Sequence, residues 1–137
     1  RNRKASMTSI ILVDDEPDIR DSVQRILEQA GFQVRVAATG AEGIEEFRRA
    51  PSDLLITDMI MPHGQGIDVI RELRAVHPGL RILAISGGGN FGAQSYQAGA
   101  ISTAAYLAAA TAAGAKVALT KPFTREKLLA AVNEALR

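Results

Sequence analysis

Five short runs of apolar residues are spaced along the chain, and each has the length of a β-strand. Continuous apolar runs such as Ile10–Val13 are typical of parallel strands that are buried on both faces. The sequence therefore predicts five strands, at Ser9–Val13, Phe32–Ala37, Leu54–Thr57, Arg81–Ile85 and Lys116–Leu119.

Amphipathic segments separate these runs and predict helices. Pro17 is suited to the first turn of a helix, and Gly31 and Gly114 are suited to follow a helix end. The predicted helices cover residues 17–30, 41–50, 66–76, 102–113 and about 124–137, with a turn at Thr39 and Gly40. Strands that alternate with helices form a parallel sheet with helices on both faces. We therefore predict one α/β domain with a doubly wound sheet.

Composition narrows the class of protein. The chain has 137 residues, of which 47% are hydrophobic and 23% charged, and it has no cysteine. These values fit one globular domain and exclude disulfide scaffolds, zinc–thiolate sites and cysteine nucleophiles. No apolar run has the ~20 residues of a membrane span, and the basic N-terminus is unlike a secretory signal. We expect a cytoplasmic domain with no membrane contact.

The net charge gives no support to nucleic-acid binding. Residues 1–6 resemble a cloning remnant before a native start at Met7, which leaves residues 7–137 as the domain. Without the three basic residues of that segment, the charge changes from +1 to −2. A nucleic-acid-binding domain carries a basic patch or stripe, so we expect no direct nucleic-acid binding.

Polar side chains follow four of the predicted strands. Asp14 and Asp15 follow the first strand, Asp58 the third, Ser86 the fourth and Lys121 the fifth. Ligands of such sheets bind beyond the carboxyl ends of the strands, where the strand order reverses. Crowded carboxylates favour a divalent cation such as Mg²⁺, and a carboxylate beside a metal and a lysine suits phosphoryl transfer. Taken alone, an Asp-Asp-Glu run after a strand is also common in a solvated loop or helix cap.

Together these residues form motifs that resemble the receiver domain of two-component response regulators. The resemblance covers residues 8–137, and its motifs are Val13-Asp14-Asp15-Glu16-Pro17, Thr57-Asp58-Met59-Ile60-Met61-Pro62 with Gly66, Ile85-Ser86-Gly87 and Lys121-Pro122-Phe123. It implies a flavodoxin-like fold with the strand order 2-1-3-4-5. It also implies a phosphorylation-dependent switch in a phosphorelay, and not an enzyme that acts on an external substrate.

The resemblance also implies a role for each residue of the acidic group. Asp58 would accept the phosphoryl group. Asp15, Asp58 and the backbone carbonyl of Ile60 would bind Mg²⁺ directly, and Asp14 would act through a metal-bound water.

Two further residues would act on the phosphoryl group itself. Ser86 would form a hydrogen bond with it, and Lys121 would pair first with Asp58 and then with the phosphoryl oxygens. The family also usually has the bond equivalent to Lys121–Pro122 in the cis form, which we predict here.

Two features depart from the family pattern. The segment at about 87–103 is longer than usual. The residues in and just after it, such as Tyr106 and Leu107, are either ordinary helix packing or part of a mobile lid or partner surface beside the phosphorylation site. Ala118 stands where many receivers carry an aromatic residue that reports phosphorylation. The switch is then relayed differently, or the output does not use this position.

Three functional alternatives follow. The first is a receiver, alone or part of a larger regulator or hybrid kinase, that is phosphorylated by a histidine kinase or a histidine phosphotransfer protein. It would act on an unidentified protein partner, with a possible homodimer through the helix at 102–113, the fifth strand and the last helix. The second is a pseudo-receiver that only binds partners. The third is a metal-dependent phosphohydrolase, which usually needs an acidic residue where this chain has Ile60.

Overall fold

A parallel five-stranded sheet forms the centre of the molecule. The computed structural model describes residues 8–59, 66–86 and 108–137. The strands are β1 (Ser9–Val13), β2 (Gln33–Ala37), β3 (Leu54–Asp58), β4 (Arg81–Ser86) and β5 (Val117–Thr120). Their order is β2-β1-β3-β4-β5, and all neighbours are parallel. The predicted strands and the implied strand order are confirmed.

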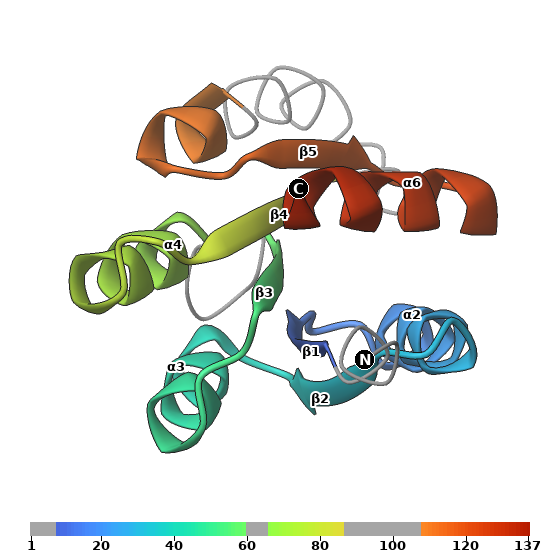
Figure 1. Ribbon diagram of the computed structural model, residues 1–137, viewed down its shortest axis with the longest axis horizontal. Coiled ribbons are helices and arrows are strands. Elements are labelled where there is room, and N and C mark those ends of the chain that lie inside the picture. Colours follow the sequence, from blue (N-terminus) through green and yellow to red (C-terminus); the bar gives the residue numbers. More distant parts are fainter. Residues whose placement is uncertain (1–7, 60–65, 87–107) are drawn as a thin grey trace, which may run out of the picture.

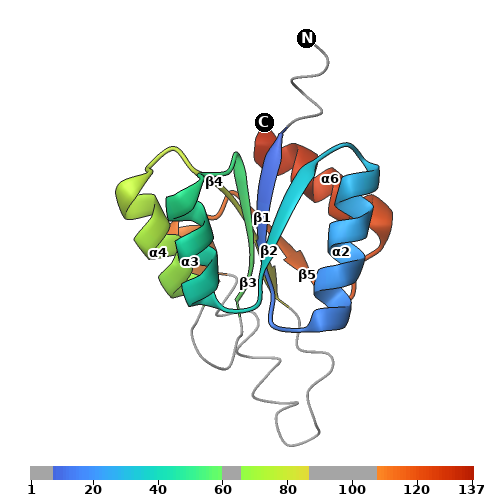
Figure 2. The ribbon, with the colours of Figure 1, turned by 90° about the horizontal axis from the view of Figure 1, so that it is seen from below.

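Helices cover both faces of this sheet, as predicted. They are α2 (Pro17–Gln29), α3 (Gly40–Arg49), α4 (Gly66–Val76) and α6 (Arg125–Leu136), and residues 108–113 are also helical. Figures 1 and 2 show α2 and α6 on one face of the sheet and α3 and α4 on the other. The architecture is therefore doubly wound.

Each face of the sheet has its own apolar core. Alternate residues of β1 enter opposite cores, so Ile11 packs with Phe47 and Leu73, whereas Leu12 packs with Leu27 and other residues of the second core. All four residues from Ile10 to Val13 are fully buried. Burial on both faces explains why the central strands are continuous apolar runs.

The predicted helix ends agree to within one residue with those that the structure describes. Gly31 and Gly114 follow helices and have positive φ angles of 103° and 129°. The Thr124 hydroxyl accepts a hydrogen bond from the backbone N–H of Lys127 at 3.1 Å, so Thr124 caps α6. Thr39, predicted in a turn, caps α3 in the same manner, which makes Gly40 the first helical residue. A threonine that caps a helix and one in a turn look alike in sequence.

The predicted helix at 102–113 is confirmed for residues 108–113. Its first part lies outside the described residues. The predicted extension at 87–103 also lies outside them. Within the described ranges, no helix is long and apolar enough to cross a membrane.

Candidate functional site

The carboxyl ends of β1, β3, β4 and β5 bring the predicted site residues together. Val13 is paired with Thr57 and Asp58 with Ile85, so the ends of β1, β3 and β4 lie side by side. The backbone N–H of Lys121 donates to the Ser86 carbonyl at 2.8 Å, which continues the pairing of β4 with β5. Four neighbouring strands thus place their last polar side chains at one edge of the sheet.

The ammonium group of Lys121 lies among three carboxylates. Its Nζ is 3.2 Å from Asp14 Oδ2, 3.2 Å from Asp58 Oδ2 and 2.8 Å from Glu16 Oε1. The Lys121 side chain is only 11% exposed, and those of Asp14 and Asp58 are buried. One largely buried positive charge therefore offsets the three negative charges only in part, and the cluster keeps a net negative charge.

Local hydrogen bonds fix the position of Asp14. Its Oδ1 accepts the backbone N–H of Glu16 at 2.9 Å, and its backbone carbonyl accepts Arg20 Nη1 at 2.8 Å. The Asp14 N–H donates to the Ala37 carbonyl at 3.1 Å, which extends the pairing of β1 with β2. The Glu16 N–H thus holds one oxygen of the Asp14 carboxylate, and the second oxygen, Oδ2, faces Lys121.

The pKa values of this cluster follow from its crowding. Burial raises the pKa of the Asp14 carboxyl above its usual value, although the Glu16 N–H and Lys121 oppose this change. Burial lowers the pKa of Lys121, but the hydrogen bond with Glu16 and the attraction of Asp58 and Asp14 outweigh it. The net result is a lysine pKa above its usual 10.5. The ionised Asp14 is therefore costly to the fold, whereas the charged Lys121 is stabilising.

The acidic cluster offers ligands that suit a hard divalent cation. One carboxylate oxygen from each of Asp14, Glu16 and Asp58 lies within 4.8 Å of the others. Oxygen donors of this kind are those that Mg²⁺ and Ca²⁺ prefer. The donor set therefore fits a metal ion such as Mg²⁺.

The predicted metal ligands are placed in different ways. Asp14 and Asp58 belong to the group of close carboxylates, whereas Asp15 is half-buried and is not a member of it. Ile60, whose carbonyl is another predicted ligand, lies outside the described residues. The predicted ligand roles of Asp15 and Ile60 stay predictions.

Ser86 lies at the end of β4 and is fully buried. In the part of the chain that the structure describes, its hydroxyl has no hydrogen-bond partner. A buried hydroxyl is usually paired. Ser86 therefore keeps a donor and an acceptor at the edge of the sheet that carries the acidic cluster.

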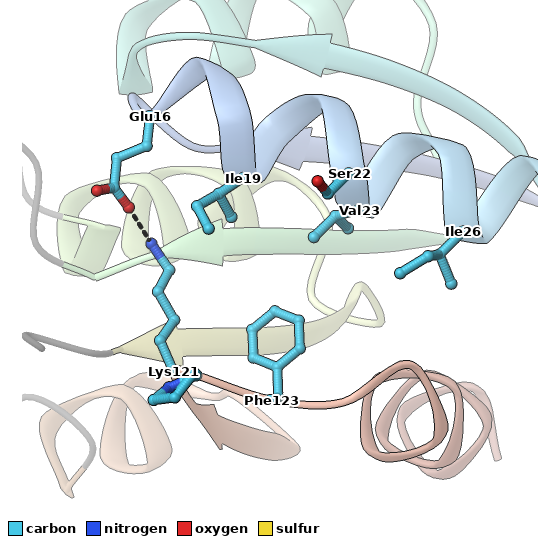
Figure 3. A pocket seen from close by; sticks show the side chains of 8 residues that line it. Glu16, Ile19, Ser22, Val23, Ile26, Lys121 and Phe123 are labelled. Atoms are coloured by element: carbon cyan, nitrogen blue, oxygen red, sulfur yellow. Dashed lines mark hydrogen bonds and ion pairs between the residues drawn. The ribbon is translucent and has the colours of Figure 1, made fainter. Parts of the chain in front are cut away.

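An apolar groove adjoins the cluster. It has a volume of about 430 Å³ and lies between α2 and the residues after β5, and the pair of Glu16 and Lys121 forms its polar end. Figure 3 shows Ile19 and Phe123 along this groove. The Lys121–Pro122 peptide bond beside it is cis, as predicted.

Glu16 is the member of the cluster whose role the sequence did not reveal. It stands in the first motif, but no role was assigned to it. Its Oε1 makes the shortest of the three contacts with Lys121. The sequence held only a weak sign of this contact. Glu16 holds the N-cap position of α2, where glutamate is not among the favoured residues.

Asp14→Asn is expected to raise the unfolding midpoint of the metal-free protein at neutral pH. A carboxyl with a raised pKa in the folded state costs stability as pH rises through that pKa, and asparagine does not ionise. The asparagine oxygen can still accept the Glu16 N–H. Thermal unfolding from pH 4 to pH 8 checks this, and the advantage of the variant should grow with pH.

The same variant should also gain less stability from added Mg²⁺ than the wild type, because the stabilisation by a ligand that binds the folded state rises with the logarithm of its affinity. Asp21→Asn, on the exposed side of α2, is the matched control and should behave like the wild type. A lower midpoint for Asp14→Asn in metal-free buffer would contradict the account of Asp14.

Known proteins share the sequence pattern of this chain. The sequence model of the response regulator receiver domain matches residues 10–133. The response regulator MprA of Mycobacterium leprae is 34% identical over 128 residues, which cover 93% of this chain and 50% of MprA. The chemotaxis protein CheY of Thermotoga maritima is 29% identical over 126 residues, which cover 91% of this chain and 94% of that CheY.

The fold agrees with this match. The chemotaxis response regulator CheY4 of Vibrio cholerae superimposes with a TM-score of 0.76 at 28% identity, covering 95% of this chain and 99% of CheY4. The chain spans about half the length of MprA and nearly all of the Thermotoga CheY. Both the sequence and the fold lead to the same conclusion: the chain belongs to the family of response regulator receiver domains.

Proposed function

We propose that this receiver domain is a signalling switch that accepts a phosphoryl group on Asp58. The observation that carries the proposal is the position of the Asp58 carboxylate. It lies at the end of a fully buried strand, and its Oδ2 is 3.2 Å from the ammonium of Lys121. A rigidly held carboxylate beside a positive charge is suited to act as a nucleophile towards a phosphoryl donor.

The transfer forms an acyl phosphate. A carboxylate oxygen of Asp58 attacks phosphorus, the bond from phosphorus to the donor atom breaks, and the leaving group departs with the electron pair. Lys121 would offset the negative charge of the transferred group. Ser86, with its buried hydroxyl, would form a hydrogen bond with a phosphoryl oxygen.

We propose Mg²⁺ as the metal, held by Asp14, Asp15, Asp58 and the backbone carbonyl of Ile60. Asp14 would act through a water molecule. When bound, Mg²⁺ would neutralise part of the charge on the carboxylates and on the phosphoryl oxygens. The close approach of the carboxylates of Asp14 and Asp58 supports this choice.

The proposed partners follow from the chemistry of the family. Receiver domains work with histidine kinases or histidine phosphotransfer proteins, and we propose one of these as the phosphoryl donor. The output partner is a protein that distinguishes the two states of the domain. The possible homodimer through the helix at 102–113, β5 and α6 stays a prediction, since the first part of that helix lies outside the described residues. Cytoplasmic location and lack of direct nucleic-acid binding are likewise proposals.

The output of the switch is not relayed through an aromatic side chain at position 118. Ala118 is exposed on β5 and has no group that could turn inward. Either the signal passes through other residues, or the output does not use this position.

Intact mass after incubation with Mg²⁺ and acetyl phosphate tests the proposed function. We expect one added phosphoryl group on the wild type and none on Asp58→Asn. Asp68→Asn, an exposed change in the first turn of α4, should accept one group as the wild type does. A folded wild type that gains no phosphoryl group, from acetyl phosphate or from a histidine kinase, would contradict the proposal and favour a pseudo-receiver. Turnover of unrelated phosphomonoesters would instead indicate a phosphohydrolase.

A further inference from the structure

The side chain of Glu16 does not cap the helix that it precedes. It is the N-cap residue of α2, with φ −91° and ψ 113°, but its side chain makes no capping hydrogen bond. The backbone N–H of Glu16 is bound by Asp14 Oδ1 at 2.9 Å. Serine, threonine, aspartate and asparagine are the residues that cap well at this position. Helix capping therefore gives no reason for a glutamate here.

The Glu16 carboxylate is instead directed at Lys121, 105 residues further along the chain. Figure 3 shows the two side chains pointing toward each other at the polar end of the groove. Their contact of 2.8 Å is shorter than the 3.2 Å between Lys121 and each of Asp14 and Asp58. Glu16 is also the most accessible of the three carboxylates, with 31% of its side chain exposed.

The lysine cannot satisfy every acceptor once a phosphoryl group arrives. An ammonium has three N–H donors, and three carboxylates already lie within 3.2 Å of Lys121 Nζ. A phosphoryl group at Asp58 adds further oxygen acceptors with a high negative charge. Lys121 already donates hydrogen bonds to Glu16 and Asp58. The phosphoryl oxygens would compete with these carboxylates for the ammonium, and the partner with the shortest contact holds it most strongly.

We propose that Glu16 is a positioning residue that competes with the phosphoryl group for Lys121 and so slows phosphorylation of Asp58. This inference rests on the proposed function. Glu16 acts through Lys121 and also adds a negative charge that repels an incoming anionic donor. It thereby sets the rate at which this domain responds, while Asp58 remains the residue that reacts.

The neutral substitution Glu16→Gln separates these effects from folding. Glutamine keeps the length of the side chain but loses the charge that holds Lys121 and repels the donor. We expect the rate of phosphorylation to rise roughly three- to tenfold at limiting donor, the order expected for loss of one nearby charge in a partly exposed site. Glu16→Ala should change the rate in the same direction. Glu45→Gln, an exposed change on α3 with the same effect on net charge, is the matched control.

The experiment measures the rate of phosphoryl gain by intact mass over a series of acetyl phosphate concentrations. Mg²⁺ is kept at a level above which the rate of each protein no longer rises, so that a change in metal affinity does not contribute. In each transfer one P–O bond forms to Asp58, the P–O bond to acetate breaks, and acetate leaves with the electron pair. Unfolding midpoints are recorded for every variant.

A faster rate at limiting donor for both Glu16 variants, with the rate of Glu45→Gln unchanged, would support the inference. A merely structural role for Glu16 would lower the unfolding midpoint and would not accelerate transfer. A rate equal to or below that of the wild type in both folded Glu16 variants would overturn the inference and leave the proposed function intact. A wild type that gains no phosphoryl group would overturn both the inference and the proposed function.

Discussion

Lys121→Met is expected to destabilise the metal-free protein by about 3–5 kcal/mol, the usual cost of removing one partner from a buried ion pair. Methionine has a similar volume but no charge, so the carboxylates of Asp14, Glu16 and Asp58 would face one another without a counterion. Urea denaturation at neutral pH measures this loss. The same variant should accept phosphoryl groups far more slowly, because nothing but the metal would offset the charge of the transferred group.

The pH dependence of this loss has a definite sign. Lys121 has a raised pKa in the folded protein, so its contribution is fully present below pH 10.5, the usual lysine value, and disappears only as pH rises through the raised pKa. In the variant, the Asp14 carboxyl loses the attraction of Lys121, which lowers its pKa in the wild type. As pH falls Asp14 takes up a proton, and the difference from the wild type should shrink.

Two further observations isolate the charge of Lys121. Lys116→Met, at an exposed lysine just before β5, is the matched control and should change the free energy of unfolding by no more than about 0.5 kcal/mol. Added Mg²⁺ should restore part of the stability of Lys121→Met, because the metal would replace the missing positive charge. A variant as stable as the wild type in metal-free buffer would contradict the role given to Lys121.

Gly66→Ala is expected to lower both stability and the rate of phosphorylation. Gly66 is the buried first residue of α4, and its N–H donates to the Met59 carbonyl at 3.3 Å. A Cβ atom at this position would lie 2.2 Å from the Asp58 carbonyl oxygen and 2.9 Å from Met59 Cα. These are backbone atoms, which cannot move aside as a flexible side chain can.

The clash should cost about 2–3 kcal/mol, in the upper part of the range for overpacked sites. It should also displace Asp58, and a small displacement of a reacting group lowers the rate strongly. Urea denaturation and the rate of phosphoryl gain measure the two effects. Gly79→Ala is the matched control, because no atom lies within 4 Å of its added Cβ. If Gly66→Ala kept wild-type stability and rate, the close approach of Gly66 to Asp58 would have no functional importance.

Much of the fold could be predicted from the sequence because buried positions are occupied by apolar residues. The apolar runs at β1 and β3 have no polar alternation, since both faces of these strands are covered. Thr124 and Gly114 mark helix ends with local chemistry that needs no tertiary contact. Thr39 was less clear, because a threonine before a helix and one in a turn use the same side-chain hydrogen bond.

The candidate site was predicted in composition but not in full geometry. Asp14, Asp58, Ser86 and Lys121 each end or follow a strand, so the topology of the sheet brings them together. The contact of Glu16 with Lys121 depends on two side-chain conformations and on the path of the chain after β5, and neither leaves a periodic signal. The roles of Asp15 and Ile60 rest on the family resemblance alone.

Localisation of the phosphoryl group tests the central claim most directly. The wild-type protein is incubated with Mg²⁺ and acetyl phosphate, and the product is reduced with borohydride, which converts an aspartyl phosphate to homoserine. Peptide mass spectrometry then locates the modified residue. The account predicts modification of Asp58 alone, with no modification of Asp14 or Asp15. Modification at another carboxylate, or an unmodified Asp58 in a protein that carries a phosphoryl group, would contradict it.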